Sequence, residues 1–164
     1  MTSVDRYSHS RFARAGIRGR RRRALNETYP AVAAAVPVAR RQIVGFAAAS
    51  GADFDQIDSI RLAASEALSN AVQHAYPDRP GKMEVAAWLV QGELWILIAD
   101  EGCGLHAGGR SEGLGLGLAL ISQVSDGFVV MERGSGGTEV RIRFDLGVGE
   151  YREDSSDGQV HFLH

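Results

Sequence analysis

The sequence predicts an α+β fold, a two-layer sandwich in which helices cover one face of a mostly antiparallel sheet. Apolar residues recur at helical spacing between residues 31 and 76 and then alternate from residue 83 onward. The alternating segments come in two pairs, joined by Gln91-Gly92 and by "GSGG" at 134–137. Tight turns of this kind connect antiparallel neighbours. With 164 residues, 45% of them hydrophobic, the chain suffices for one domain with a substantial core.

The first half of this domain is predicted to hold one strand and two helices. Residues 24–32 read as a short extended segment and are a candidate edge strand. Residues 31–51 are alanine-rich and apolar at helical spacing, which predicts the first helix. Pro37 marks either a kink in that helix or its first turn. A second helix is expected from near Asp58 to residue 76.

The second half is predicted to hold two hairpins with a helix between them. Residues 83–90 and 93–100 form the first hairpin, and a glycine-rich loop follows it. This loop opens into a short helix over residues 116–126. Residues 128–133 and 138–146 form the second hairpin.

The charge is distributed unevenly along the chain. Residues 1–23 carry eight arginines against one acid, which leaves ten basic against nineteen acidic residues in the rest. We expect a basic, disordered tail over 1–23, the folded domain over 24–146 and an acidic mobile tail over 147–164. The run "RGRRRR" at 18–23 could touch nucleic acid or an acidic partner. The acidic body argues against nucleic acid as the main ligand.

Cysteine content and hydropathy bound the location of the protein. Cys103 is the single cysteine, so no disulfide can form within the chain. No run reaches the roughly 18 apolar residues of a membrane span, and the N-terminus lacks the apolar region of a signal peptide. We expect a cytoplasmic protein without a membrane partner.

The glycine-rich loop matches neither of two familiar phosphate loops. Seven of the sixteen residues from Gly102 to Gly117 are glycine, which is costly unless the backbone bends sharply or approaches a ligand. A Walker loop needs a Lys-Ser/Thr pair after its glycines, and the only lysine is the remote Lys82. A Rossmann loop needs a strand–helix–strand unit with parallel strands, whereas the flanking strands here belong to hairpins.

The same loop is nevertheless suited to a nucleotide. The segment Gly113–Gly117 opens a helix, so its N–H groups and the positive helix end can face a phosphate. Asp100, at a strand end, can accept a hydrogen bond from an exocyclic amine such as that of adenine. The alternative is a mobile surface loop without a ligand.

The second helix carries the candidate catalytic groups. Leu62, Glu66, Asn70 and His74 follow at four-residue steps and therefore share one stripe of the helix. The amide oxygen of Asn70 suits Mg²⁺, which takes few protein ligands. The carboxylate of Glu66 can accept a proton from a hydroxyl or water that attacks a phosphate. Alternatively both residues line a solvated face, and His74 either orients a substrate or packs beside Tyr76.

Four segments together resemble a known superfamily. The segments "EALSNAVQHAY", "DEGCGL", "GLGLGLALI" and "GGTEVRI" look like the four nucleotide-binding boxes of GHKL proteins, which include gyrase, heat-shock chaperones, histidine kinases and MutL. Their order and spacing match over residues 29–146. The chain length and the short lid resemble most closely the anti-sigma-factor serine kinases of bacteria. The resemblance implies the Bergerat ATP-binding fold.

The resemblance implies a role for individual residues. Glu66 matches the catalytic base and Asn70 matches the Mg²⁺ ligand. Asp100 matches the adenine-binding aspartate, and Thr138 matches the threonine that helps to hold the adenine. The other matches are the wall and lid-hinge glycines Gly102 and Gly104, the phosphate-wrapping glycines Gly113, Gly115 and Gly117, and the lid residue Arg110, near the γ-phosphate or the partner.

The resemblance therefore implies an ATP-dependent serine kinase with Mg²⁺ as its metal. Such a protein binds a sigma factor in one state and phosphorylates a serine of an anti-sigma-factor antagonist in the other, and it could form a homodimer. The alternative is a nucleotide-gated protein-binding module without kinase activity, which would not require Glu66 as a base. A nucleic-acid-binding regulator would rest on residues 1–23 alone.

Overall fold

The computed structural model describes residues 22–76, 79–104, 114–134 and 136–147. These residues form an α+β domain whose helices and strands follow one another in the order that the sequence predicts. In chain order they are β1 (Arg22–Pro30), a 3-10 turn (Ala33–Ala35), α2 (Val36–Ala49), α3 (Phe54–His74), β2 (Lys82–Val90), β3 (Glu93–Asp100), α4 (Leu114–Val124), β4 (Gly127–Glu132) and β5 (Thr138–Asp145).

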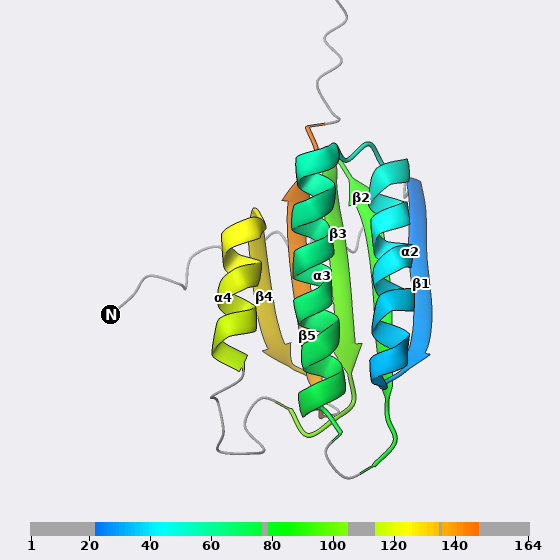
Figure 1. Ribbon diagram of the computed structural model, residues 1–164, viewed down its shortest axis with the longest axis vertical. Helices are drawn as coiled ribbons and strands as arrows, with labels where there is room; N and C mark the ends of the chain where they lie inside the picture. The colour runs from blue at the N-terminus through cyan, green and yellow to red at the C-terminus, as the bar shows by residue number, and fades with distance from the viewer. Residues whose placement is uncertain (1–21, 77–78, 105–113, 135, 148–164) are drawn as a thin grey trace, which may run out of the picture.

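The five strands form one antiparallel sheet in the order β1-β2-β3-β5-β4. The three helices all lie on one face of it, with α3 between α4 and α2 (Figure 1). Both predicted hairpins are present, and β1 is an edge strand as predicted. The pairing of β3 with β5 joins the two hairpins. Because of this pairing, the end of β3 and the start of β5 lie side by side.

The starts of all three helices differ from the prediction. Helix α3 begins at Phe54, not near Asp58, because Asp53 caps it: Oδ1 of Asp53 accepts from the Gln56 N–H at 2.8 Å, and Gln56 Oε1 accepts from the Asp53 N–H at 3.0 Å. A reciprocal capping box of this kind stabilises a helix start by about 0.5–2 kcal/mol. Helix α4 begins at Leu114, two residues early. Helix α2 begins at Val36, not at residue 31, with Pro37 in its first turn, and residues Ala33–Ala35 form the separate 3-10 turn.

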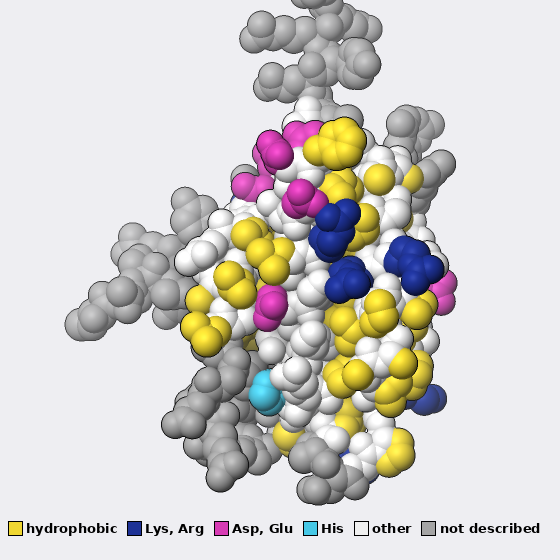
Figure 2. Space-filling view, in the orientation of Figure 1, with side chains coloured by type: hydrophobic (Ala, Val, Ile, Leu, Met, Phe, Trp, Pro, Cys, Tyr) yellow, Lys and Arg dark blue, Asp and Glu magenta, His cyan; other side chains and the backbone are white. Residues whose placement is uncertain are grey.

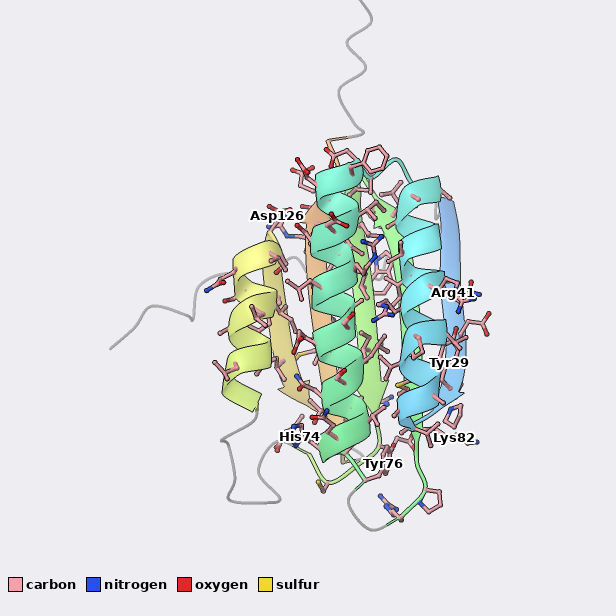
Figure 3. The ribbon with its side chains drawn as sticks, viewed as in Figure 1. Tyr29, Arg41, His74, Tyr76, Lys82 and Asp126 are labelled. Carbon is pink, nitrogen blue, oxygen red and sulfur yellow. The ribbon has the colours of Figure 1, made fainter. Side chains whose placement is uncertain are left out.

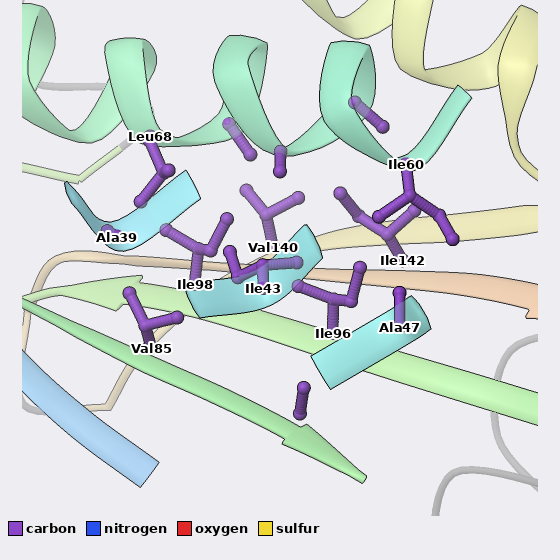
Figure 4. Close-up of a cluster of buried hydrophobic side chains, with 14 of the residues drawn as sticks. Ala39, Ile43, Ala47, Ile60, Leu68, Val85, Ile96, Ile98, Val140 and Ile142 are labelled. Atoms are coloured by element: carbon purple, nitrogen blue, oxygen red, sulfur yellow. The ribbon is translucent and has the colours of Figure 1, made fainter. Parts of the chain in front are cut away.

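The core lies between the helices and the sheet. Isoleucine and valine side chains from β2, β3 and β5 meet apolar side chains of α2 and α3 there (Figure 4). Full burial of one such side chain contributes about 1.5–3 kcal/mol. The sheet-facing side of α3 is mostly alanine, including Ala63, Ala64, Ala67 and Ala71, all buried. These small side chains let α3 approach the sheet closely, which fixes the position of its polar stripe.

The helix-bearing side of the molecule shows separate apolar and charged areas. Figure 2 shows apolar side chains gathered over α4 and α2, with arginines between them. Among the leucines whose exposure the structure describes, Leu116 in α4 is the most exposed, at 77%. Within the described ranges, no helix has the length and apolar character needed to cross a bilayer.

Candidate functional site

One pocket opens beside the C-terminal end of α3. Its space, including the solvent-filled mouth, is about 460 Å³. Figure 3 labels His74 at this end of α3. The lining residues come from five elements and one loop, namely Ala67, Asn70, Ala71, His74 and Ala75 around α3, Ile98 and Asp100 from β3, Gly104, Leu118 from α4, Val130 from β4, and Thr138 and Val140 from β5.

Asp100 is the buried charged group of this pocket, at only 5% exposure. Its Oδ1 accepts two backbone N–H groups, from Gly102 at 2.9 Å and from Thr138 at 3.2 Å. Burial raises the pKa of Asp100, and these two hydrogen bonds and the charge of Arg133 oppose that rise. Both backbone donors use the same oxygen, which leaves Oδ2 as the oxygen for a ligand.

The loop after β3 packs against the C-terminal end of α3 and forms hydrogen bonds with it. A Cβ at Gly102 would lie 2.1 Å from the carbonyl oxygen of Ala75, so a side chain there is excluded. The Cys103 N–H donates to the same oxygen at 3.0 Å, and Cys103 Sγ donates to the His74 carbonyl at 3.2 Å. Gly104 follows with φ of +75°, a conformation that favours glycine. Gly102 therefore packs against the end of α3, and Gly104 lines the pocket.

Tyr76 also holds this loop in place, through hydrogen bonds of its hydroxyl group. Its hydroxyl accepts the Glu101 N–H and donates to the Lys82 carbonyl, both at 2.7 Å. Arg79 donates to the Glu101 carbonyl at 3.1 Å, and its guanidinium lies 5.6 Å from the centre of the Tyr76 ring. Figure 3 labels Tyr76 and Lys82 at the same end of the molecule as His74. His74 itself lines the pocket.

Gly137 is a site residue that the sequence analysis missed. It has φ of +89°, and a Cβ there would lie 2.1 Å from the Asp100 carbonyl oxygen. Only glycine can therefore bring the next residue, Thr138, close enough for its N–H to reach Asp100. The double glycine before Thr138 was the available signal, because paired glycines indicate backbone that must bend or approach closely.

A second group of predicted residues meets between α3 and α4. A Cβ at Gly117 would lie 3.0 Å from Glu66 Oε2 and 3.4 Å from Asn70 Nδ2. The backbone of α4 therefore packs directly against these two side chains. Asn70 Nδ2 is buried and has no hydrogen-bond partner among the described residues. Glu66 does not line the pocket, but it lies one helical turn from Asn70, which does.

The residues present fit a nucleotide. Apolar walls with one buried carboxylate suit a flat base that carries an amino group, and the unpartnered Asn70 amide faces the same pocket. The first turn of α4 contains Gly115 and Gly117, where backbone N–H groups favour an anion. Across the described part of the chain, no three His, Cys, Asp or Glu side chains cluster as metal ligands. A metal held here by Asn70 would rely on ligand and water oxygens for its other bonds.

The structure thus brings together most of the predicted site residues. Asp100, Gly102 and Thr138 are joined by hydrogen bonds, while Glu66 and Asn70 contact Gly117. Arg110 and Gly113 lie outside the described residues.

Comparison with known proteins agrees with this geometry. The model of the "Histidine kinase-like ATPase domain" family matches residues 29–144. The serine-protein kinase RsbW of Bacillus licheniformis is 34% identical over 135 residues, covering 73% of this chain and 77% of that protein. RsbW of Bacillus subtilis (strain 168) is 33% identical over 87 residues, covering 52% of this chain and 54% of its own length.

A solved structure shows the same arrangement. The RsbU and RsbW domains of a Mycobacterium tuberculosis protein match with a TM-score of 0.60 and 29% identity, covering 76% of this chain and 32% of that one. Sequence, fold and pocket therefore lead to one conclusion: the chain belongs to the histidine kinase-like ATPase family and, within it, is related to the RsbW serine-protein kinases.

Proposed function

We propose that this protein is an ATP-dependent serine protein kinase that acts as an anti-sigma regulatory factor. In one state it sequesters a sigma factor, and in the other it phosphorylates a serine of an anti-sigma-factor antagonist. The observation that carries the proposal is the position of α3, which brings the Glu66–Asn70 pair beside the pocket that contains Asp100. The relatives named as serine-protein kinases support the choice of substrate residue.

In this proposal the pocket holds ATP with its adenine inward. Asp100 Oδ2 accepts a hydrogen bond from the adenine amino group, and the apolar side chains of Ile98 and Val130 border the ring. Guanine presents a carbonyl oxygen at that place, so it would face an unfavourable contact between two acceptors. Mispairing of a buried hydrogen bond costs about 1–3 kcal/mol, so GTP should bind at least about tenfold more weakly than ATP.

The phosphates then lie toward α4. Backbone N–H groups of the first turn of α4, around Gly115 and Gly117, would face them, and the Asn70 amide oxygen would hold Mg²⁺. Bound Mg²⁺ would neutralise charge that develops on the phosphates during transfer. The buried, unpartnered Nδ2 of Asn70 would find an acceptor in a phosphate or water oxygen.

Glu66 is the proposed general base. Within the described ranges, no hydrogen bond or ion pair engages its carboxylate, and Gly117 packs against Oε2. A free carboxylate one turn from the metal ligand can accept the proton of the incoming serine hydroxyl. The exposed Leu116 and Leu120 lie on α4 next to this position and offer an apolar surface to the substrate protein.

Phosphotransfer to candidate antagonist proteins tests the proposal. The full chain is incubated with labelled ATP, Mg²⁺ and each antagonist, alongside the variants Glu66→Ala and Gln73→Ala. Gln73 is exposed on the same helix and serves as the matched control. The Glu66→Ala variant should still bind ATP but lose about 10²–10⁴-fold in rate, or about 3–5 kcal/mol, because a general base contributes that much.

Two outcomes would contradict the kinase. Transfer by Glu66→Ala at the wild-type rate would show that Glu66 is not the base. If the wild-type protein transfers no phosphate to any antagonist, yet its affinity for a protein partner changes with ATP, then a nucleotide-gated binding module is the better description.

A further inference from the structure

The Tyr76 hydroxyl lies between two strands at the point where their pairing ends. It accepts the Glu101 N–H and donates to the Lys82 carbonyl, both at 2.7 Å. The pairing of β2 with β3 ends at Met83 and Asp100. In the same register Lys82 would lie opposite Glu101, one pair further on. The hydroxyl therefore joins two main-chain groups that the ladder itself leaves apart.

A direct hydrogen bond between the strands would otherwise fill this position. The two-residue turn after Val90 makes Val90 and Glu93 a pair that exchanges both main-chain bonds. Every second pair of an antiparallel ladder does the same. Counting back in twos from Val90 reaches Lys82, so the pair of Lys82 with Glu101 falls on a bonded position. The Tyr76 hydroxyl replaces the main-chain bond of that pair and ends the ladder one residue early.

The ring of Tyr76 is fitted to this place. A Cβ at Gly81 would lie 2.3 Å from three atoms of the ring, so glycine leaves the room that the ring occupies. Arg79 lies with its guanidinium 5.6 Å from the ring centre and donates to the Glu101 carbonyl at 3.1 Å. Both main-chain polar groups of Glu101 are thus bonded to side chains from the segment between α3 and β2.

This early end of the ladder places a donor beside Asp100. Directly after Glu101 the chain turns toward α3, where Gly102 packs against the Ala75 carbonyl. In that position the Gly102 N–H donates to Asp100 Oδ1 at 2.9 Å. One further pair between β2 and β3 would draw Glu101 toward β2 and carry the Gly102 N–H away from the carboxylate. The second donor, the Thr138 N–H, comes from β5 and does not depend on this arrangement.

We propose that Tyr76 is a positioning residue for adenine recognition, because its hydroxyl ends the ladder at Asp100 and so holds the Gly102 N–H in place as a donor to the carboxylate. An acceptor that is fixed before the ligand arrives costs less affinity than one that must be ordered on binding. This inference rests on the ATP site proposed above. Tyr76 does not line the pocket, so it acts through the loop and not by touching the nucleotide.

The first test is amide hydrogen exchange in the full chain without nucleotide, for wild type and Tyr76→Phe. Phenylalanine keeps the ring and removes only the hydroxyl. The Gly102 amide should exchange about two- to tenfold faster, because the loss of one hydrogen bond lowers the free energy of local opening by the corresponding amount. The Thr138 amide donates to the same oxygen and should exchange at the wild-type rate, which makes it the internal control.

The second test is ATP affinity, measured by calorimetry on the same proteins. In Tyr76→Phe the carboxylate of Asp100 loses one of its two orienting donors, so the dissociation constant should rise about two- to tenfold. The urea midpoint of unfolding should stay near that of wild type, because the main-chain groups of Glu101 and Lys82 can then bond to each other. The matched control is Tyr29→Phe, which removes a hydroxyl from the edge strand β1 and should leave ATP affinity unchanged.

The outcomes separate this inference from the proposed function. Equal acceleration of Gly102 and Thr138 exchange would show a general effect on the fold and overturns the positioning role. Wild-type ATP affinity in Tyr76→Phe overturns it as well, while ATP binding itself stands. A wild-type protein that binds no ATP overturns the proposed function, and the role of Tyr76 in adenine recognition with it.

A second variant covers the case in which Tyr76→Phe does not unfold cooperatively. Gly81→Ala then replaces it, because the new Cβ would displace the Tyr76 ring. The same loss of Gly102 protection and of ATP affinity is expected. Wild-type values of both in Gly81→Ala would overturn the inference.

Discussion

The two ends of the pocket are built differently. At the end near β3, Asp100 is buried and held by backbone N–H groups from two separate segments, at Gly102 and Thr138. At the end near α4, Glu66 and Asn70 extend from one helix and pack against the backbone of Gly117. One polar atom at this second end, Asn70 Nδ2, has no partner in the described part of the chain.

This difference separates two tasks that a nucleotide site performs. Recognition of a base needs an acceptor that is fixed before the ligand arrives, because ordering it on binding would cost affinity. Phosphate and metal binding supply strong charges of their own, so the protein groups can be left without partners until the ligand completes them. Backbone contacts should therefore matter most at the Asp100 end, and side chains most at the Glu66 end.

The largest effect is expected from a substitution that displaces the backbone of the turn beside Asp100. In Gly137→Ala the new Cβ would lie 2.1 Å from the Asp100 carbonyl oxygen at φ of +89°, so the turn must move. We expect a loss of about 2–4 kcal/mol in the free energy of unfolding and a loss of ATP binding. Thermal unfolding and ATP titration measure both. Gly134→Ala is the control from the same turn, because a Cβ there meets nothing within 4 Å.

The next largest effect is expected from Asp100→Asn, which replaces one carboxylate oxygen with an amide nitrogen. In Asp100→Asn the two backbone donors keep an oxygen in the Oδ1 position, so the new amide nitrogen replaces Oδ2 and presents a donor to the adenine amino group. ATP affinity should fall by about 1–3 kcal/mol, or about five- to 150-fold. Unchanged affinity in calorimetric titration would remove Asp100 from the adenine contact.

The same variant should be more stable than wild type when no nucleotide is present. Burial raises the folded-state pKa of Asp100, so the stabilising contribution of its protonated form is present at acid pH and is lost as pH rises through that pKa. At neutral pH the wild-type protein carries a buried ionised carboxylate that the variant lacks. The gain in unfolding temperature should be largest at neutral pH and shrink on acidification.

A smaller effect is expected at the other end. Asn70→Ala removes the proposed metal ligand together with a buried donor that has no described partner, so the fold should remain intact. Groups that merely support metal sites change affinity by about 10–100-fold, so the part of ATP affinity that depends on Mg²⁺ should fall at least about tenfold. Calorimetry with and without Mg²⁺ shows this. Identical behaviour of variant and wild type in both conditions would exclude the ligand role.

The smallest effect is expected from a substitution that raises stability and lowers activity. Gly117→Ala should stabilise α4 by about 0.5–1 kcal/mol, because alanine favours helix more than glycine does. Its Cβ would also displace Glu66 Oε2, which lies 3.0 Å from that position, and phosphotransfer should slow about threefold. Gly45→Ala in α2, where a Cβ meets nothing within 4 Å, should gain stability without slowing transfer. A Gly117→Ala variant with unchanged transfer would place the base elsewhere.

Local patterns predicted most of the fold. The change from helical to alternating periodicity located the helices and strands to within a few residues. The start of α3 was predicted four residues too late, because Phe54 is 93% exposed and the apolar period begins only later. The spacing of Asp53 and Gln56 was a sufficient signal, since these two residues form a capping box.

The residues of the candidate site were harder to predict from local sequence patterns than the helices and strands were. The sequence predicts two hairpins but not that β3 pairs with β5, and this pairing is what brings Thr138 to Asp100. Gly137 owes its importance to the same long-range contact. The Glu66–Asn70 spacing could be interpreted from the helix alone, because four residues make about one helical turn. Residues on one element were therefore predictable, whereas those joined across elements needed the family resemblance or the structure.

The position of Cys103 has a practical consequence for measurement. It is the only cysteine among 164 residues, it is exposed, and it lies between Gly102 and Gly104 at the edge of the pocket. A thiol-reactive fluorophore would therefore attach to one place in the native chain, without prior mutagenesis. The one described hydrogen bond of its thiol, to the His74 carbonyl, is weak because a thiol is a poor donor. A single dye at this point would report nucleotide arrival in real time and under single-molecule conditions.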